Sequence, residues 1–313
     1  MLDRPDVQLY SDGDEANIRR MSDQKAVSKI YCGPSGWEHI ERTSREHPLE
    51  FIAANFDVVE ISETFAAFPR QELTKVWLRK VRKNSEFQFT AKLNRRFTHD
   101  RALDAADVNG FKDGLLPLLG AGRLGCLLMQ FPWSFRYTRE NRDHLIRLRR
   151  TFHEFPLAAE MRHESWMVDE AVGTFIDYRI GFCNIDQPTY TRAMPPTAFL
   201  TAATGYVRLH GRNSFNWFQD DRAPRKAHRY DYLYSAMELA EWKARVDKIA
   251  GFAARTFVIL NNDAGGKEIV NGLQLRSMLR GGDSADVPAD LLRKYPVHSS
   301  GSLFSTYPGR AVA

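Results

Sequence analysis

Ionisable side chains close several short apolar runs, and their types indicate acid/base chemistry. In residues 158–166, AAEMRHESW, an apolar run opens into Glu160 and Arg162. Glu60 closes an earlier run, FDVVEI, so the two glutamates can serve as general acid and general base if their environments separate their pKa values. The alternative is that each carboxylate only neutralises a neighbouring cation such as Lys92.

Three arginines and one lysine fit an anion-binding role. Arg162, Arg208 and Arg212 end or follow apolar runs, and a planar guanidinium group matches the oxygens of phosphate or carboxylate. Structural pairing with carboxylates is the alternative for each of them. Lys267 stands in AGGKE, a glycine-rich turn that opens a helical pattern, where phosphate often binds. Together these residues predict a small anionic or phosphorylated ligand.

Two histidines are candidates for proton transfer or metal ligation. His210 and His99 can play either role, although a lone histidine is more often a hydrogen-bonded structural residue. The two glutamates, with Asp186 and His210, would supply oxygen and nitrogen ligands, but the neighbouring lysine and arginines would repel a divalent cation. No pair of histidines has the spacing of a strong metal motif. We therefore predict no metal and no cofactor, with a divalent metal kept as an alternative.

Aromatic and amide side chains complete the candidate site. Trp37 and Trp166 follow apolar runs and can either stack against a sugar or base or cap the core. The other candidates are polar residues at the ends of apolar runs: Gln130, Asn261, Asn262 and Asp263.

The elements that must position these side chains are eight short runs rich in apolar, β-branched or aromatic residues. They are residues 30–33, 56–61, 87–93, 124–131, 157–162, 179–186, 205–211 and 256–262. Helical patterns separate most of these runs; Leu145, Leu148, Phe152 and Phe155, for example, share one helix face. Strands that alternate with helices pair in parallel through right-handed crossovers, and eight of them favour closure. The pattern predicts an α/β fold, a (β/α)₈ TIM barrel.

Successive residues of a strand face opposite sides, which sorts the polar groups. On one parity lie Gln88, Thr90 and Lys92, then Glu160 and Arg162, then Asn184 and Asp186, then Arg208 and His210. Because the helices need apolar partners, we expect this polar parity to face the barrel lumen. Catalytic sites of such barrels lie at the carboxyl ends of the strands, so we predict a ligand site at that mouth.

The remaining chain divides into one domain, two long loops and two extensions. We expect the barrel to span residues 29–281 as a single domain. Residues 1–28 and 282–313 lack periodicity, so we predict extensions with little fixed structure, the second of them partly disordered. Two irregular connections, residues 187–204 and 212–230, are typical of active-site loops.

Composition excludes a membrane protein and leaves nucleic acid open. No apolar run approaches the roughly 18–20 residues that span a bilayer. The formal net charge of +5 is too small to indicate nucleic acid by itself, but residues 79–101 and 208–229 are enriched in Arg and Lys. The second stretch also carries Phe215, Trp217 and Phe218, which can stack on bases.

The amino-terminal sequence and the cysteines indicate a cytoplasmic protein. The first 20 residues are polar and acidic, where a signal peptide would be basic and then apolar. Cys32, Cys126 and Cys183 are far apart and lie inside apolar runs, so we expect reduced core thiols.

Seven motifs follow one another along residues 30–280. They are GPSGW (33–37), FDVVEI then TF (56–65), F-x-FTAK with a later FTH (89–99), LLMQFP (127–132), EMRHESW (160–166), YVRLHGR (206–212) and LNND followed by GK (260–267). In this ordered set the chain resembles the YecE-like family, which is catalogued as domain of unknown function 72 and has a TIM-barrel fold. The resemblance implies the fold and no particular activity.

Several positions depart from the pattern of that family. Where the family commonly has Asn and Tyr after the second strand, this chain has Ser62 and Ala66, and Trp133 replaces the second proline after Gln-x-Pro. These positions lie near the mouth, so any family-wide role for them is not carried over to this chain.

The leading hypothesis is an enzyme that acts on a phosphorylated or otherwise anionic substrate, such as a sugar phosphate or a nucleic-acid end. Glu60, Glu160 and either Lys92 or His210 would move protons in a reaction of hydrolase, lyase or isomerase type. One alternative is a nucleic-acid or nucleotide binding protein without turnover. Another is a scaffold that docks a protein partner through residues 212–230. The sequence leaves the oligomeric state open.

Overall fold

The computed structural model describes residues 28–37, 47–215, 217, 229–282 and 287–295. Eight parallel strands form one sheet in the order β1-β8-β7-β6-β5-β4-β3-β2. The strands are β1 (Lys29–Pro34), β2 (Val58–Ile61), β3 (Gln88–Lys92), β4 (Leu124–Gln130), β5 (Leu157–Glu160), β6 (Gly181–Asp186), β7 (Thr204–Leu209) and β8 (Arg255–Leu260).

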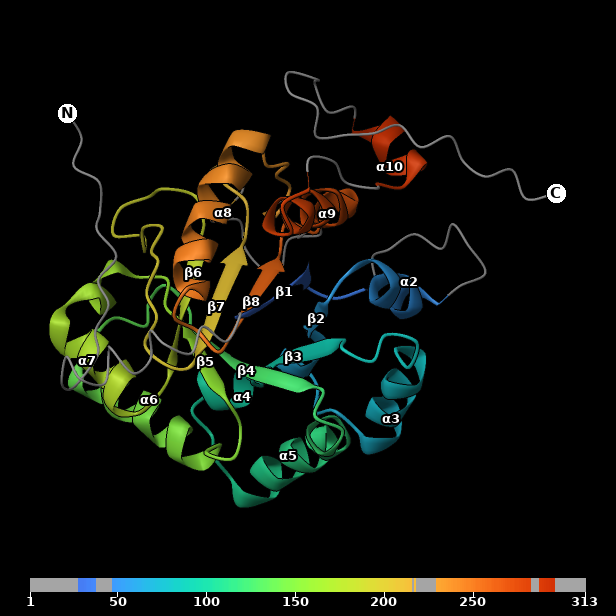
Figure 1. The fold of residues 1–313 in the computed structure, drawn as a ribbon. Helices are drawn as coiled ribbons and strands as arrows, with labels where there is room; N and C mark the ends of the chain where they lie inside the picture. Colours follow the sequence, from blue (N-terminus) through green and yellow to red (C-terminus); the bar gives the residue numbers. More distant parts are fainter. Residues whose placement is uncertain (1–27, 38–46, 216, 218–228, 283–286, 296–313) are drawn as a thin grey trace, which may run out of the picture.

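Helices surround these strands on the outside (Figure 1). They are α2 (Pro48–Asn55), α3 (Gln71–Lys80), α4 (Arg95–Thr98), α5 (Ala105–Gly120), α6 (Arg139–Thr151), α7 (Asp169–Asp177), α8 (Ala236–Ala250), α9 (Lys267–Leu279) and α10 (Ala289–Lys294), with the 3₁₀ turns η1 (Glu63–Phe65), η2 (Glu164–Met167) and η4 (Ala264–Gly266). The fold is therefore a (β/α)₈ barrel, as the sequence predicts.

The barrel closes between its first two strands. The Asp57 amide donates to the Cys32 carbonyl at 3.1 Å, and the Gly36 amide donates to the Glu60 carbonyl at 2.9 Å. At Gly33, a Cβ atom would lie 1.7 Å from the Val58 carbonyl oxygen, so only glycine allows β1 and β2 to approach this closely. The GPSGW motif thus has a structural role in closure.

Aromatic rings fill the lumen below the mouth. Tyr31 stacks on Phe257 with ring centroids 5.2 Å apart, and Tyr206 lies 6.1 Å from the same ring. A Cβ at Gly125 would lie 2.2 Å from the Phe257 ring, so a glycine in β4 leaves the space that this ring occupies. The lower lumen is packed and closed, which leaves the carboxyl ends of the strands as the open side.

Local sequence explains where the helices that follow β4 and β7 begin. Ser235 caps α8 in a capping box with Glu238, and the Thr138 side chain caps α6. The apolar face of α6 buries Leu145 and Leu148 against the barrel, as their spacing predicts. These helices fix the loops that carry part of the mouth.

The predicted extensions lie mostly outside the described residues. This holds for residues 1–27, 283–286 and 296–313 and, in the predicted loop after β7, for residues 218–228. The described part of the carboxyl-terminal extension is not irregular throughout, because it contains α10. Tyr295, which follows α10, donates from its hydroxyl to the Gly265 carbonyl at 2.8 Å. None of the helices in the described part of the chain combines the length and apolar character needed to cross a membrane.

Candidate functional site

The side chain of Arg208 lies at the centre of the barrel mouth and is fully buried. Its Nη1 donates to Glu160 Oε2 at 2.5 Å, and its Nη2 donates to Glu60 Oε1 at 2.8 Å and to Asn261 Oδ1 at 2.6 Å. Arg208 therefore bridges two carboxylates that come from β2 and β5, on opposite sides of the lumen. Its Nε has no hydrogen-bond partner among the described residues.

Glu60 is surrounded by donors. Ser35 Oγ donates to Glu60 Oε1 at 3.0 Å, and the Tyr206 hydroxyl donates to Oε2 at 2.9 Å. In β2 the apolar residues Val59 and Ile61 take the opposite parity, which turns Glu60 into the lumen. The carboxylate is fully buried and hydrogen-bonded on both oxygens.

Glu160 gathers a second set of partners. Arg162 Nε donates to its Oε1 at 2.8 Å, and His210 Nε2 lies 3.2 Å from the same oxygen. Asn261 Nδ2 lies 3.1 Å from His210 Nδ1, which is the arrangement of an amide donating to a neutral imidazole. Glu60, Lys92, Glu160, Arg162, Arg208 and His210 are called the lumen cluster below.

Both carboxylates of the lumen cluster are held ionised. Burial alone would raise the pKa of Glu60, but Arg208 and Lys92 outweigh it and lower that pKa. Burial is likewise outweighed at Glu160, whose pKa lies well below its ordinary value because of Arg208, His210 and Arg162. The two pKa values are thus shifted in the same direction, so neither glutamate is a proton donor at neutral pH.

The imidazole of His210 is neutral at neutral pH. Burial is the largest cause and lowers its pKa from 6.5 to about 4, although the charge of Glu160 acts in the opposite direction. At neutral pH the lumen cluster therefore contains three cationic side chains, Lys92, Arg162 and Arg208, against two carboxylates.

Lys92 is the member of the lumen cluster that reaches open space. Its Nζ lies 3.7 Å from Glu60 Oε1, beyond hydrogen-bond distance, and no hydrogen bond joins it to a described residue. The side chain is 14% exposed. Burial and the charge of Arg208 lower its pKa, whereas Glu60, Tyr230 and Glu160 act to raise it.

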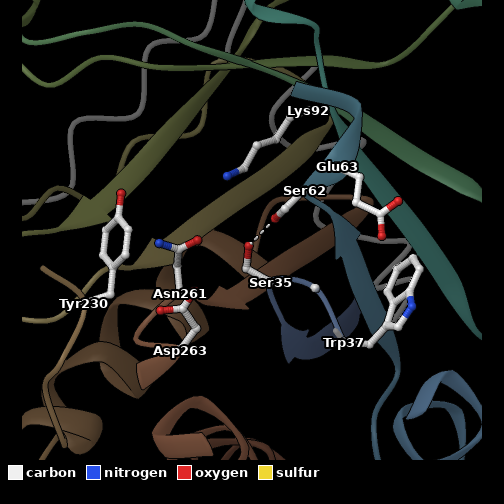
Figure 2. Close-up of a pocket in the computed structure, with 9 residues that line it drawn as sticks. Ser35, Trp37, Ser62, Glu63, Lys92, Tyr230, Asn261 and Asp263 are labelled. Carbon is white, nitrogen blue, oxygen red and sulfur yellow. Dashed lines mark hydrogen bonds between the residues drawn. The ribbon is translucent and has the colours of Figure 1, made fainter. Parts of the chain in front are cut away.

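A pocket of about 170 Å³ lies above Lys92 and is shown in Figure 2. The amine of Lys92 points into it between Ser62 and Tyr230 (Figure 2). The lining comes from the ends of β1, β2, β3 and β8 and from the loop before α8: Ser35, Gly36, Trp37, Ser62, Glu63, Lys92, Tyr230, Asn261 and Asp263. Trp37 lines the pocket while its ring packs edge-on against Trp77 at 5.4 Å, so both predicted roles are compatible with its position.

Aromatic rings surround Arg162 beside this pocket. The guanidinium carbon lies 5.4 Å from the Trp217 ring, and Trp217 lies 6.0 Å from Tyr230 and 6.5 Å from Tyr190. Burial opposes ionisation of Tyr230, but Arg162 and Lys92 outweigh it and lower the pKa of this phenol. Arg162 Nη2 is buried and has no hydrogen-bond partner in the described part of the chain.

Asp186 and Arg212 lie outside the lumen, which corrects the parity prediction for β6. Arg212 Nε contacts both oxygens of Asp186, at 2.9 and 3.1 Å, and Arg212 Nη1 lies 3.0 Å from Glu238 Oε1 in α8. On the same face, Asn184 donates to the Phe199 carbonyl at 3.0 Å. The outer face of β6 packs against polar residues of loops and of α8. Polar side chains in this strand therefore face outward, and their polarity does not show which side faces the lumen. Asp186, Arg212 and Glu238 are called the outer cluster below.

Two other predicted site residues are held in the surrounding structure. Trp166 is fully buried, and its Nε1 donates to the Phe135 carbonyl at 2.7 Å, so it packs in the core and not at the mouth. Asn262 Nδ2 donates to Asn271 Oδ1 in α9 at 2.9 Å, on the side opposite to Asn261.

Three more predicted residues lie at the edges of the lumen cluster or apart from it. Gln130 is the nearest, with Oε1 3.5 Å from Arg208 Nη1. His99 packs edge-on against Phe65 at 5.2 Å, and its Nδ1 lies 2.9 Å from Thr98 Oγ1. Lys267 forms an ion pair with Asp231 and lies 5.6 Å from the Tyr295 ring. A binding role for these three stays a prediction.

No group of three or more His, Cys, Asp or Glu side chains among the described residues is arranged to hold a metal ion. Within the lumen cluster, Arg208 and Lys92 occupy the positions next to the carboxylates that a cation would need.

Residues 31–292 match the family described as "Protein of unknown function DUF72". The chain belongs to the DUF72 family. This confirms the family resemblance that the seven motifs indicated.

Each match covers almost the whole length of the related protein. The UPF0759 protein YunF of Bacillus subtilis (strain 168) is 27% identical over 272 residues, which cover 80% of this chain and 94% of that protein. The crystal structure of a DUF72 family protein (TM1631) from Thermotoga maritima MSB8 matches with a TM-score of 0.71 at 29% identity, over 80% of this chain and 99% of that one. A DUF72 family protein (EF0366) from Enterococcus faecalis V583 matches with a TM-score of 0.72 at 26% identity, over 80% and 95% of the two chains.

Sequence reasoning missed several residues that contribute to the site of this DUF72 chain. Tyr206 shares the parity of Arg208 and His210 in β7, so the same rule could have included it. Tyr230 comes from an irregular loop, where no periodicity indicates which side chain turns inward. Trp217, in the same loop, was named only as an aromatic residue of a basic stretch that can stack on bases. Ser62 stands where the family commonly has Asn, and its hydroxyl lies 2.8 Å from that of Ser35.

Proposed function

We propose that the protein is an enzyme that binds a small anionic substrate, phosphorylated or bearing a carboxylate, in the pocket above Lys92. The observation that carries this proposal is the excess of one positive charge in the lumen cluster, with Lys92 open to the pocket. A buried cation without a full set of partners is costly, and an anionic ligand would supply the missing ones.

Proton transfer is the chemistry that these side chains support best. Lys92 and Tyr230 both line the pocket, and the pKa of each is shifted below its ordinary value. Such shifts bring a lysine or a tyrosine closer to the range where it exchanges protons with a substrate. Glu60, permanently ionised beside Lys92, would orient the amine, and His210 would hold Glu160 and Asn261 in place. The reaction would be of hydrolase, lyase or isomerase type.

A ligand screen tests this proposal. We would measure the melting temperature with inorganic phosphate, sugar phosphates, nucleotides and small carboxylates, and then assay turnover of each compound that stabilises the protein. We expect stabilisation by one class of anion in the wild type and its loss in Lys92→Met. Lys243→Met, which removes a surface lysine paired with Asp247, is the control and should respond like the wild type. Equal responses of all three proteins would contradict the proposal.

The aromatic rings around Arg162 favour a second candidate, a nucleotide or nucleic-acid binding protein without turnover. The Trp217 ring lies near the rings of Tyr190 and Tyr230 and near the Arg162 guanidinium group, a combination that suits bases. Oligonucleotide affinity that falls steeply with salt, without any product, would support this candidate over the enzyme. Cytoplasmic location and independence of metal stay predictions.

A further inference from the structure

Lys92 presents a primary amine to the pocket in a way that an ordinary structural lysine does not. Its nearest charged partner, Glu60 Oε1, lies 3.7 Å away, and that carboxylate already accepts from Ser35, Tyr206 and Arg208. Glu60 therefore has three hydrogen-bond donors without the Lys92 amine. Among the described residues Lys92 Nζ has no hydrogen bond, and it points into the pocket (Figure 2).

The surroundings of this amine make it easier for the ammonium group, which attracts the anion, to release a proton and become a neutral nucleophile. A lysine becomes a nucleophile when it is desolvated or stands next to another cation. Lys92 meets both conditions, because it is largely buried and shares Glu60 with Arg208. Glu60, Tyr230 and Glu160 act in the opposite direction, but the two glutamates are already paired with Arg208.

We propose that Lys92 forms an imine with an aldehyde or ketone that carries the anionic group, an inference that rests on the anion-binding function proposed above. The Nζ lone pair attacks the carbonyl carbon and forms the C–N bond, while a proton moves from nitrogen to the carbonyl oxygen to give a carbinolamine. That oxygen takes a further proton and leaves as water, and the nitrogen, which keeps its remaining hydrogen, forms the C=N bond of a protonated imine; loss of that proton gives the neutral imine. The step consumes no oxidant or reductant, and water reverses it.

Tyr230 is placed to serve this step. Its hydroxyl lines the pocket across from Lys92 and is the acid that would protonate the departing oxygen (Figure 2). An imine then draws electrons from the adjacent carbon, so a C–H or C–C bond there becomes easier to break. The reaction class is thereby narrowed to isomerase or lyase. The pocket of about 170 Å³ is smaller than drug-sized sites of roughly 300–1,000 Å³, which fits a small carbonyl compound.

Reductive trapping tests the inference on the full chain. The protein would be incubated separately with pyruvate, dihydroxyacetone phosphate and glycolaldehyde phosphate, reduced with sodium borohydride, and analysed by intact mass and peptide mapping. We expect at least one compound to add a single group, and the modified peptide to contain Lys92. Absence of an adduct with all three compounds, or an adduct confined to other lysines, would overturn the inference.

Two variants separate this result from the proposed function. Lys92→Arg keeps the positive charge but cannot form the imine, so it should lose the adduct and retain phosphate binding. Lys243→Arg changes a surface lysine that is paired with Asp247, outside the site, and should keep the adduct. An adduct that persists in Lys92→Arg overturns the inference. If the wild type binds phosphate but forms no adduct, only the imine is overturned. If the wild type neither binds phosphate nor forms an adduct, the proposed function is overturned as well.

Discussion

Two groups of carboxylates and arginines lie at the carboxyl ends of the strands, a buried one inside the barrel and a partly exposed one outside it. The outer cluster joins β6 to α8, and its carboxylates outnumber its single cation, Arg212. The lumen cluster has the opposite balance, and one of its cations reaches a pocket. Burial raises the pKa of Asp186, whereas Arg208 holds those of Glu60 and Glu160 below their ordinary values despite burial. The same residue types therefore join a strand to a helix in the outer cluster and form a candidate ligand site in the lumen cluster.

The largest effect that distinguishes the two clusters is on stability. Glu160→Gln leaves the buried Arg162 without its counter-charge and Arg208 with Glu60 alone, and we expect a loss of about 3–5 kcal/mol in the free energy of unfolding. Asp186→Asn leaves Arg212 with Glu238 and with access to water, and we expect a loss of only about 1 kcal/mol. Urea denaturation of both variants measures the difference. Equal losses would mean that the two clusters are equivalent anchors.

Acid pH should weaken the lumen cluster through His210. His210 has a folded pKa of about 4 against an ordinary value of 6.5, so between these values only the unfolded state takes up the proton. Stability from this group is present above pH 6.5 and falls by roughly 2–3 kcal/mol as pH decreases to 4. Below about 4.5, the lowered pKa values of Glu60 and Glu160 add a further loss.

Melting temperatures across this pH range, compared with those of His210→Gln, measure the effect. The variant should show a shallower slope between pH 6.5 and 4, and the remaining slope comes from His144, outside the lumen cluster, whose pKa burial likewise lowers to about 4. Asp186→Asn is the matched control from the outer cluster and should keep that slope, since the raised pKa of Asp186 acts in the opposite direction. A slope that vanishes in Asp186→Asn instead would assign the acid sensitivity to the outer cluster.

The smallest expected effect concerns the stability of a lysine variant. Lys92→Met removes a buried ammonium group whose charge burial disfavours, so we expect unchanged stability or a gain of up to about 1 kcal/mol. Lys112→Met, which breaks the 2.6 Å ion pair with Glu154 on the outer surface, should bring no gain. A loss of more than about 1.5 kcal/mol in Lys92→Met would show that Lys92 stabilises Glu60 and is not held for a ligand.

The comparison also explains how far the sequence predicts this molecule. The alternation of strands and helices was sufficient to predict the barrel. Parity also brought together the polar residues of β2, β3, β5 and β7, because the helices that cover these strands offer apolar partners; those residues are Glu60, Lys92, Glu160 and Arg208. The rule failed for β6, where Asp186 meets an arginine from the loop after β7. Such pairing depends on the path of that loop, which no local pattern in the sequence fixes.

The loop residues of the pocket were unpredictable for the same reason. Tyr230 lies in an irregular stretch, and its position next to Lys92 follows from how that stretch returns to the barrel before α8. Conversely, Trp166 ends a motif-like segment but turns into the core, where Phe135 accepts its hydrogen bond. Charged strand ends indicate the region of a site more reliably than the residues that complete it.

A titration with inorganic phosphate tests the central claim most directly, namely that the lumen cluster carries a positive charge available to an anion. Isothermal titration calorimetry would compare the wild type, Lys92→Met and Arg212→Met at one salt concentration. We expect one phosphate site in the wild type. The affinity should be at least about tenfold weaker in Lys92→Met, which corresponds to about 1.4 kcal/mol, and unchanged in Arg212→Met. Equal affinity in all three proteins, or weakening only in Arg212→Met, would contradict the central claim.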